Sequence, residues 1–351
     1  MSRLMKTDQN SMTKASSQRV RGLDSIRFFC ALWVAFSHGA YPPLTLGHDP
    51  NSTFAWFING CYTTLFCGPA AVIIFFVISG FCIHYPYREK WTKAYIIPFL
   101  TSRAIRITGP IGVILIINLA TDRPNSSFYA LIGWSIMCEL FYYSIYPFIR
   151  CLINTRKGWK TLFSISLAPT FSAPFFFAVN TVNYPGFGPI YTVFLGLPCW
   201  LCGVLIAEQI DSRKHSDSNS LIILRSTVII VAFITHFLAL QEILGHPFTL
   251  NFFSILVMYW LREEIVHFRK SSPYIFLEKA GLASYSLYLV HGHITSLILH
   301  AGIPNLGTGL NIIIHWIFLA VCTVGYFFLV EKPFHILAKK TKYLSSGKKT
   351  N

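Results

Sequence analysis

Residues 21–42 read Arg-Gly-Leu-Asp-Ser-Ile-Arg-Phe-Phe-Cys-Ala-Leu-Trp-Val-Ala-Phe-Ser-His-Gly-Ala-Tyr-Pro. Three ionisable side chains at helical spacing, Arg21, Asp24 and Arg27, precede an apolar run that ends near His38. Arg27 and His38 are eleven residues apart, so in a helix they share one face and lie about 16 Å apart along the axis. An ionisable group at that depth in a membrane is costly and indicates a functional site. The spacing fits equally well a neutral histidine that hydrogen-bonds a neighbouring helix.

The composition of the chain is that of a membrane protein. Its 351 residues are 53% hydrophobic and 12% charged, with a mean hydropathy of +0.51, whereas soluble domains carry about 25% charged residues. Residues 1–20 are polar and basic, and we expect them to form a disordered cytoplasmic tail. We expect residues 21–334 to form one membrane domain and residues 335–351 to form a second basic cytoplasmic tail.

Ten apolar segments follow one another along the chain, several of them shorter than the roughly 20 residues of a simple span. We therefore expect an all-α, polytopic membrane helix bundle of about ten transmembrane helices. The connections are short, and none has room for a soluble domain. The segments are 25–42, 67–85, 105–120, 128–149, 161–180, 188–208, 222–241, 248–261, 281–300 and 311–330.

The basic residues predict the orientation. With both termini in the cytoplasm, 27 of the 29 Lys and Arg residues fall in cytoplasmic tails, loops or helix starts. The exceptions are Arg27, at the inner end of the first span, and Arg123, in an outer loop. This bias follows the positive-inside rule and requires an even number of spans. The net charge of +15 then serves inner-leaflet anchoring, with no nucleic acid as a partner.

Small residues and cysteines inside the apolar segments are typical of close packing. Ser79-Gly80 in an apolar helix predicts a close helix–helix contact, with a nucleophilic role for Ser79 as the less favoured alternative. Most of the nine cysteines read as small buried hydrophobic residues. Cys61 and Cys67 fall on the predicted outer side, where an oxidising compartment would allow them to pair.

Two arginines, Arg103 and Arg106, lie one turn apart at the predicted cytoplasmic start of the third span. Positive-inside anchoring explains most such pairs. A phosphate clamp is the sharper interpretation, because the guanidinium fork binds phosphate oxygens in a bidentate way that lysine cannot match.

Glu139 is the only acidic residue deep in any predicted span. A carboxylate in lipid must be paired, hydrogen-bonded or protonated. It is therefore either a structural partner of an arginine or histidine, or an acid–base group. His291 and His293 in the ninth segment raise the question of a metal site with His38 and Glu139. Because residues two apart point to different faces of a helix, we expect no metal there.

These motifs together resemble acyltransferase family 3, a family of integral membrane enzymes. They occur in family order from residue 21 to 334, so the resemblance covers nearly the whole chain. The motifs are Arg21-x-x-Asp24-x-x-Arg27 with His38, Phe75 to Phe81, Arg103-x-x-Arg106, Trp134-Ser135 with Glu139-x-x-Tyr142, Tyr288-x-x-His291 and Glu331-Lys332-Pro333.

The resemblance implies ten spans with cytoplasmic termini, in agreement with the charge count. It also implies transfer of an acyl group, commonly acetyl from acetyl-CoA, to a hydroxyl of a carbohydrate of the cell envelope. The implied location is a bacterial inner membrane, with acyl-CoA as a substrate and no permanently bound cofactor. The site residues that it favours are His38 and Glu139 for catalysis, Arg27, Arg103 and Arg106 for acyl-CoA, and Asp24, Trp134, Ser135, Tyr142 and His291 in supporting roles.

A mechanism follows from these roles. The arginines receive the polyanionic end of acyl-CoA, and the pantetheine arm reaches inward along the face that leads to His38. His38 then removes the proton from a sugar hydroxyl, or it is itself acylated and relays the group outward. Glu139 orients His38 or the acceptor.

Two other classes of protein compete with an enzyme. A transporter or flippase would carry its interior charges along a permeation path at broken helices, but no internal two-fold repeat is visible and the arginines cluster on one side. A structural subunit of a glycan-export assembly would not require His38 for function.

Overall fold

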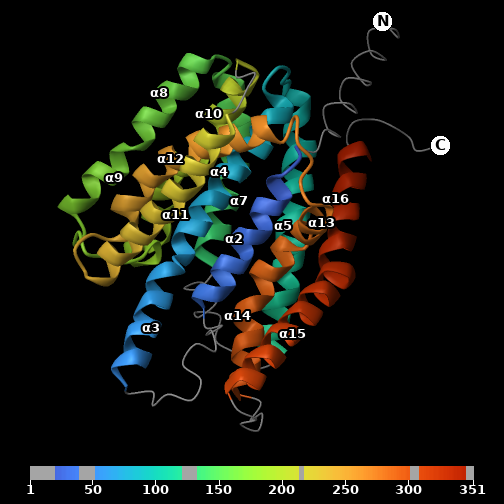
Figure 1. Cartoon of the computed structure of the whole chain (residues 1–351). Helices are drawn as coiled ribbons and strands as arrows, with labels where there is room; N and C mark the ends of the chain where they lie inside the picture. Colours follow the sequence, from blue (N-terminus) through green and yellow to red (C-terminus); the bar gives the residue numbers. More distant parts are fainter. Residues whose placement is uncertain (1–19, 39–51, 121–132, 213–216, 301–307, 345–351) are drawn as a thin grey trace, which may run out of the picture.

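The computed structural model describes residues 20–38, 52–120, 133–212, 217–300 and 308–344, which are mostly helical and contain no strand (Figure 1). The longer helices form one bundle with a few short turns between them. Its α-helices are α2 (Leu23–Ser37), α3 (Thr53–Leu65), α4 (Gly68–His84), α5 (Ile96–Ala120), α7 (Trp134–Leu152), α8 (Arg156–Ser166), α9 (Ala168–Ser172), α10 (Gly188–Gln209), α11 (Ser218–Leu240), α12 (His246–His267), α13 (Ile275–Gly281), α14 (Ser284–His300), α15 (Thr308–Tyr326) and α16 (Lys332–Leu344).

The described residues of the predicted apolar segments are mostly helical, which confirms the all-α prediction, while 39–42 and 128–132 lie outside the described residues. Several boundaries differ, and α5 begins nine residues before the predicted 105–120. The segment predicted at 161–180 is broken into α8, α9 and a 3₁₀ turn, because Pro169 and Pro174 cannot donate the backbone hydrogen bonds that a continuous helix needs. The chain before α4 is helical from Thr53, which the apolar pattern did not predict. The last helix continues to Leu344, into the predicted tail.

Five stretches are long and apolar enough to cross a membrane. They are Gly60–Tyr87, Lys93–Ala120, Tyr184–Ser212, Ser218–Leu240 and Ile313–Thr341. The protein is therefore a membrane protein, while ten spans and cytoplasmic termini stay predictions.

The centre of the bundle is the pair α4 and α10, which pack more extensively against each other than any other two helices do. A Cβ added to Gly80 would lie 1.9 Å from the carbonyl oxygen of Trp200, and one added to Gly203 would lie 2.0 Å from that of Val77. Only glycine allows the two backbones to approach this closely, so the prediction of close packing at Ser79-Gly80 is confirmed.

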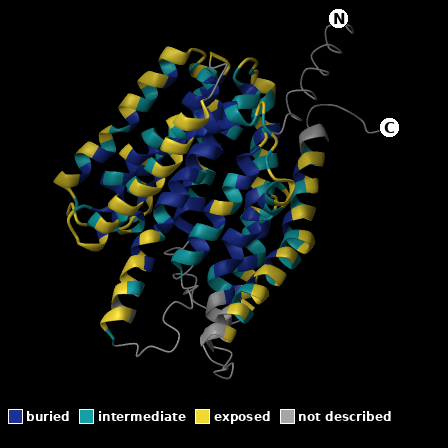
Figure 2. Cartoon of the chain, in the orientation of Figure 1, coloured by how far each residue is buried: buried dark blue, intermediate teal, exposed yellow. Residues whose placement is uncertain are grey.

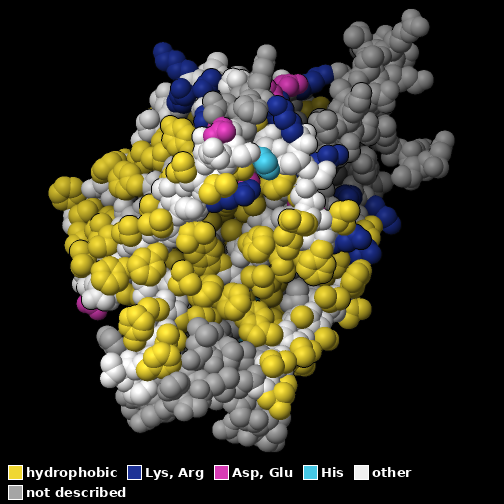
Figure 3. Space-filling model, in the orientation of Figure 1, with side chains coloured by type: hydrophobic (Ala, Val, Ile, Leu, Met, Phe, Trp, Pro, Cys, Tyr) yellow, Lys and Arg dark blue, Asp and Glu magenta, His cyan; other side chains and the backbone are white. Residues whose placement is uncertain are grey.

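The outer helices present an apolar surface. In the apolar 18-residue windows of the Gly60–Tyr87 and Tyr184–Ser212 spans 78% of the residues are buried, against 17–22% in the windows of the other three. Figure 2 shows the buried residues gathered in the middle of the bundle. Figure 3 shows hydrophobic side chains over the middle of the visible face, with Lys and Arg toward the end where α8 begins and along α16. A broad apolar belt with charges beyond it is what a bilayer requires.

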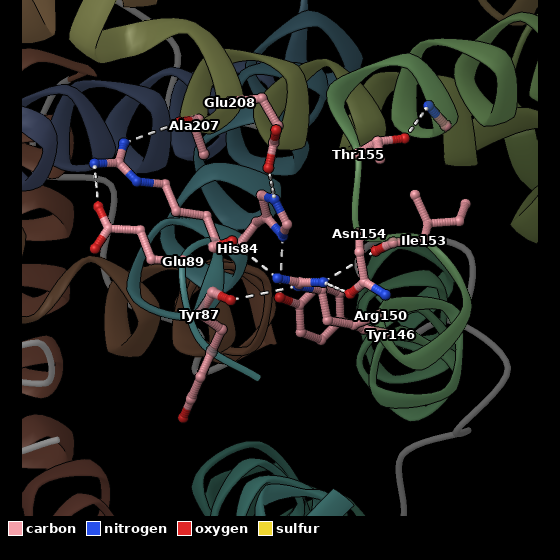
Figure 4. Close-up of polar contacts among 12 residues, drawn as sticks. His84, Tyr87, Glu89, Tyr146, Arg150, Ile153, Asn154, Thr155, Ala207 and Glu208 are labelled. Atoms are coloured by element: carbon pink, nitrogen blue, oxygen red, sulfur yellow. Dashed lines mark hydrogen bonds and ion pairs between the residues drawn. The ribbon is translucent and has the colours of Figure 1, made fainter. Parts of the chain in front are cut away.

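A polar network ties α4, α7 and α10 together at one end of the bundle (Figure 4). His84 is completely buried and lies between the Tyr146 hydroxyl at 3.0 Å and a Glu208 carboxylate oxygen at 2.7 Å. Arg150 donates to the backbone carbonyls of Tyr87 at 3.3 Å and Arg88 at 2.8 Å. These bonds satisfy carbonyls where α4 gives way to a turn.

Two carboxylates position α2 and α14, the helices that carry the candidate histidines. Glu278 of α13 accepts from the Ser25 backbone N–H at 3.0 Å and from its hydroxyl at 2.7 Å, and so caps the start of α2. Glu331 accepts from the Ser286 backbone N–H at 3.1 Å and from its hydroxyl, at the start of α14. Glu331 ends a single π-helical turn, Phe327–Glu331, between α15 and α16.

Candidate active site

His38 and His291 meet between α2 and α14. α2 ends at Ser37, and His38 follows as its capping residue. Nδ1 of His38 lies 2.9 Å from Nε2 of His291, and the two rings are stacked with an angle of 14° between their planes. The hydrogen bond joins residues 253 positions apart in the chain. The prediction that His38 meets a neighbouring helix is therefore confirmed.

The hydrogen bonds determine where the protons lie in the neutral pair. Nδ1 of His291 is 2.8 Å from the Tyr288 carbonyl oxygen, which can only accept, so His291 carries its proton on Nδ1. Nε2 of His291 is then an acceptor, and Nδ1 of His38 must be the donor to it. Among the described residues, Nε2 of His38 has no hydrogen-bond partner. His38 therefore keeps a lone pair for a substrate, while His291 holds its ring in place.

The three predicted supporting residues of α7 make different contacts, and one of them reaches the histidine pair. The Ser135 hydroxyl lies 2.7 Å from the hydroxyl of Tyr288, the residue whose carbonyl orients His291. Trp134 stacks on Tyr184 with ring centroids 5.0 Å apart. Tyr142 is buried and donates to the Val193 carbonyl at 2.7 Å. Ser135 therefore joins α7 to the histidine pair, while Trp134 and Tyr142 hold α7 against its neighbours.

The three predicted arginines form one positive cluster. Arg106 interacts electrostatically with Arg103 and Arg27. In the described part of the chain, Arg103 and Arg106 have no hydrogen-bond or ion-pair partner, and the Arg103 guanidinium lies 5.7 Å from the Phe99 ring centroid. Arg27 forms a 3.4 Å ion pair with Asp24, one turn before it, and it also interacts electrostatically with Glu139, as Arg106 does with Glu331. Because no carboxylate of the described residues contacts Arg103 or Arg106 directly, their guanidinium groups are available to a further anion.

Glu139 lies with the arginine side of the site and not with the histidine pair. Its carboxylate accepts from the Ser79 hydroxyl at 2.8 Å and from the Tyr143 hydroxyl, and it interacts electrostatically with Arg27. The sequence predicts an arginine or histidine as a structural partner of this carboxylate. Within the described residues, none of Arg27, His38, His291 and His293 hydrogen-bonds it directly.

A lone pair on His38, and the guanidinium groups of Arg103 and Arg106 on one face of α5 beside Arg27 of α2, together suit a group transfer from a polyanionic donor. The comparison with protein-family models decides the class, since the model of an acyltransferase domain matches residues 20–332. The chain belongs to acyltransferase family 3. No curated protein and no solved structure matches it significantly.

Sequence reasoning missed parts of the site of this membrane acyltransferase. It assigned Ser79 to packing, yet the Ser79 hydroxyl also receives the Trp200 indole N–H at 3.2 Å and lies 2.8 Å from the Tyr143 hydroxyl. Tyr143 follows Glu139 by four residues, a spacing that places both side chains on one helix face and could have identified the pair.

Proposed function

We propose that this acyltransferase moves an acetyl group from cytoplasmic acetyl-CoA to a hydroxyl of a carbohydrate that lies outside the membrane or on a lipid carrier. The observation that carries the proposal is the combination of the free Nε2 of His38 with the unpaired guanidinium groups of Arg103 and Arg106. The carbohydrate and the bacterial inner membrane follow from the family resemblance.

The arginine cluster suits the donor. The nucleotide end of CoA carries several phosphates, and guanidinium forks bind phosphate oxygens through two parallel hydrogen bonds. Arg103 and Arg106 have these donors unused. About 16 Å of helix separates Arg27 from His38, a separation that the flexible pantetheine arm is suited to bridge. Its thioester would then be presented near His38.

The chemistry that we propose is direct transfer with His38 as the general base. Nε2 of His38 takes the hydroxyl proton, the hydroxyl oxygen attacks the thioester carbonyl, and the carbon–sulfur bond breaks. The CoA thiolate leaves and recovers the proton from the imidazolium. During the proton transfer, the lone pair of His291 accepts from Nδ1 of His38 and stabilises the positive charge, so His291 is a positioning residue.

The relay route uses the same lone pair. Nε2 of His38 would attack the thioester and the carbon–sulfur bond would break, which leaves the CoA thiolate and an acyl-imidazolium whose Nδ1–H still bonds His291. The hydroxyl oxygen would then attack the acyl group, Nε2 of His38 would leave, and the hydroxyl proton would go to the thiolate. The two routes differ in one observable. A relay leaves radioactive acetyl on the protein when labelled acetyl-CoA is supplied without acceptor, whereas direct transfer leaves none.

The test compares cell-envelope glycans of a deletion strain, complemented either with the parent protein or with His38→Ala, by mass. We expect the acetyl-sized increment to be restored by the parent and not by His38→Ala, because general base catalysis contributes about 100- to 10,000-fold in rate. His315→Ala, on a half-buried histidine of α15, is the matched control and should restore it. Transfer by the His38→Ala protein at the parent rate would refute the role of His38, and identical glycans in deletion and parent strains would refute the carbohydrate acceptor.

A further inference from the structure

A second cluster of metal-ligating side chains lies where three other helices meet. Cys67 precedes α4, His236 lies in the last turns of α11, and His246 begins α12. One ligand atom from each lies within 4.8 Å of the other two. Cys67 and His246 are buried and His236 is partly buried. The cluster shares no residue with the His38–His291 pair.

The distances within the cluster match the ligand shell of a small metal ion. Nδ1 of His236 lies 3.0 Å from Nε2 of His246, and the Cys67 sulfur lies 3.8 Å from the same Nε2. In a tetrahedral zinc site with Zn–N near 2.05 Å and Zn–S near 2.3 Å, neighbouring ligand atoms are about 3.4 Å (N to N) and about 3.6 Å (N to S) apart. The two measured separations differ from these values by a few tenths of an ångström.

A hydrogen bond outside the cluster turns one lone pair into it. Nδ1 of His246 is 2.9 Å from the Asn183 side-chain oxygen, so the proton of a neutral His246 lies on Nδ1 and its Nε2 faces the cluster unprotonated. Nδ1 of His236 lies 3.0 Å from this lone pair. A neutral His236 either donates its proton there or, with the proton on its outer nitrogen, presents a second lone pair to the cluster.

A metal ion can replace the single proton between the two imidazoles, because each neutral ring can turn a nitrogen lone pair toward it. A metal ion engages both nitrogens and the Cys67 thiolate together. The Asn183 contact is the outer-shell hydrogen bond that metal-bound histidines use to hold their tautomer and ring orientation.

We propose that Cys67, His236 and His246 bind a zinc ion, with a fourth position open to water. One thiolate and two imidazoles favour a borderline-soft ion, and tetrahedral sulfur–nitrogen geometry favours zinc. The ion joins the α3–α4 junction, α11 and α12, and so fixes the segment on which Gly68 packs against Ser37, the neighbour of His38. Its role is to hold helices together.

The test measures metal content in the full-length protein, purified through a peptide tag that binds no metal and without chelators. We expect about one zinc per chain. Cys67→Ser and His246→Gln should each lose at least tenfold of the bound zinc. The matched control is Cys61→Ser, because Cys61 is an exposed thiol of α3, and it should keep the metal. The proposal would be overturned if the parent protein were purified without metal and took up no zinc, or if the control lost as much zinc as the other variants. Another ion at one per chain would overturn the identification of the metal as zinc.

A second measurement uses the parent protein alone, in case the variants fail to fold. After removal of zinc by a chelator, titration with Co²⁺ should give a thiolate-to-cobalt charge-transfer band at one equivalent, together with tetrahedral ligand-field bands. Zinc added back should abolish both and raise the thermal midpoint that the chelator lowered. Absence of the thiolate band, or a midpoint indifferent to chelator and zinc, would refute the site.

Discussion

Replacement of His291 tests whether the histidine pair works as the structure arranges it. In His291→Ala the Nδ1–H of His38 loses its acceptor, so the ring is free to rotate and to adopt the other tautomer. The lone pair that stabilises the His38 imidazolium during proton transfer is lost as well. His291→Gln is the informative companion, because the amide oxygen of glutamine reaches the position of Nε2 and can accept the same hydrogen bond.

The magnitude follows from the single 2.9 Å contact. A hydrogen bond to a charged group contributes about 1.5–3 kcal/mol, and each 1.36 kcal/mol of transition-state stabilisation is a factor of ten, so His291→Ala should lower the transfer rate about 10- to 150-fold. His291→Gln should lose about tenfold or less, since it keeps a neutral acceptor. Both variants should leave the half-saturating acetyl-CoA concentration near the parent value, because His291 lies apart from the arginines.

The assay follows release of the CoA thiol from acetyl-CoA by membrane vesicles with the arginine end exposed, in the presence of acceptor. Size-exclusion chromatography in detergent shows whether each variant is folded, and His315→Ala is the control for a histidine away from the site. A monodisperse His291→Ala protein that transfers at the parent rate would refute the role of the pair. Equal rates for the Ala and Gln variants would refute the acceptor role of Nε2.

Three further predictions concern the arginines, Glu139 and the central helix pair. Arg106→Lys keeps the charge but loses the fork, so the half-saturating acetyl-CoA concentration should rise about tenfold; parent-like saturation would make Arg106 a topological anchor. Glu139→Gln keeps an acceptor for Ser79 but removes the charge that acts on Arg27. We expect the variant to stay monodisperse and its transfer rate to fall about tenfold. A fully active variant would make Glu139 a packing residue. Gly203→Ala forces a Cβ to within 2.0 Å of the Val77 carbonyl oxygen, so it should destabilise the protein by about 1–3 kcal/mol and lower its thermal midpoint. Gly60→Ala, with nothing within 4 Å of its Cβ, should leave the midpoint unchanged. Equal midpoints for the two variants would contradict the packing of α4 on α10.

Local features of the site were predictable, and contacts between distant segments were not. The spacing of Arg27 and His38 on one helix face, and that of Arg103 and Arg106, follow from helical geometry alone. The partner of His38 does not follow from local geometry, because polar residues of other helices could lie equally near it. Only the packing of α14 on α2 selects His291. Glu139 shows the same limit. Its position in a predicted span required a partner for the carboxylate, but the hydroxyl groups of Ser79 and Tyr143 provide the hydrogen bonds in place of an arginine or histidine.

The cysteine pattern illustrates the limit most clearly. Cys67 is near Cys61 in the chain, which suggested a disulfide, but both are free thiols in the structure, and Cys67 is buried against His246. The ligands of the second cluster come from three segments with no motif spacing between them. Such a cluster exists only once α11 and α12 have packed beside α4.

The pairing of His38 with His291 across 253 residues has a consequence for biosynthesis. A ribosome delivers α2 to the membrane first and α14 near the end, so a nascent or truncated chain carries His38 without its partner. The pair therefore forms only at a late step of translation, after most of the bundle has been inserted. On the mechanism that we propose, incomplete chains do not consume the donor, and acyl transfer reports that insertion has reached α14.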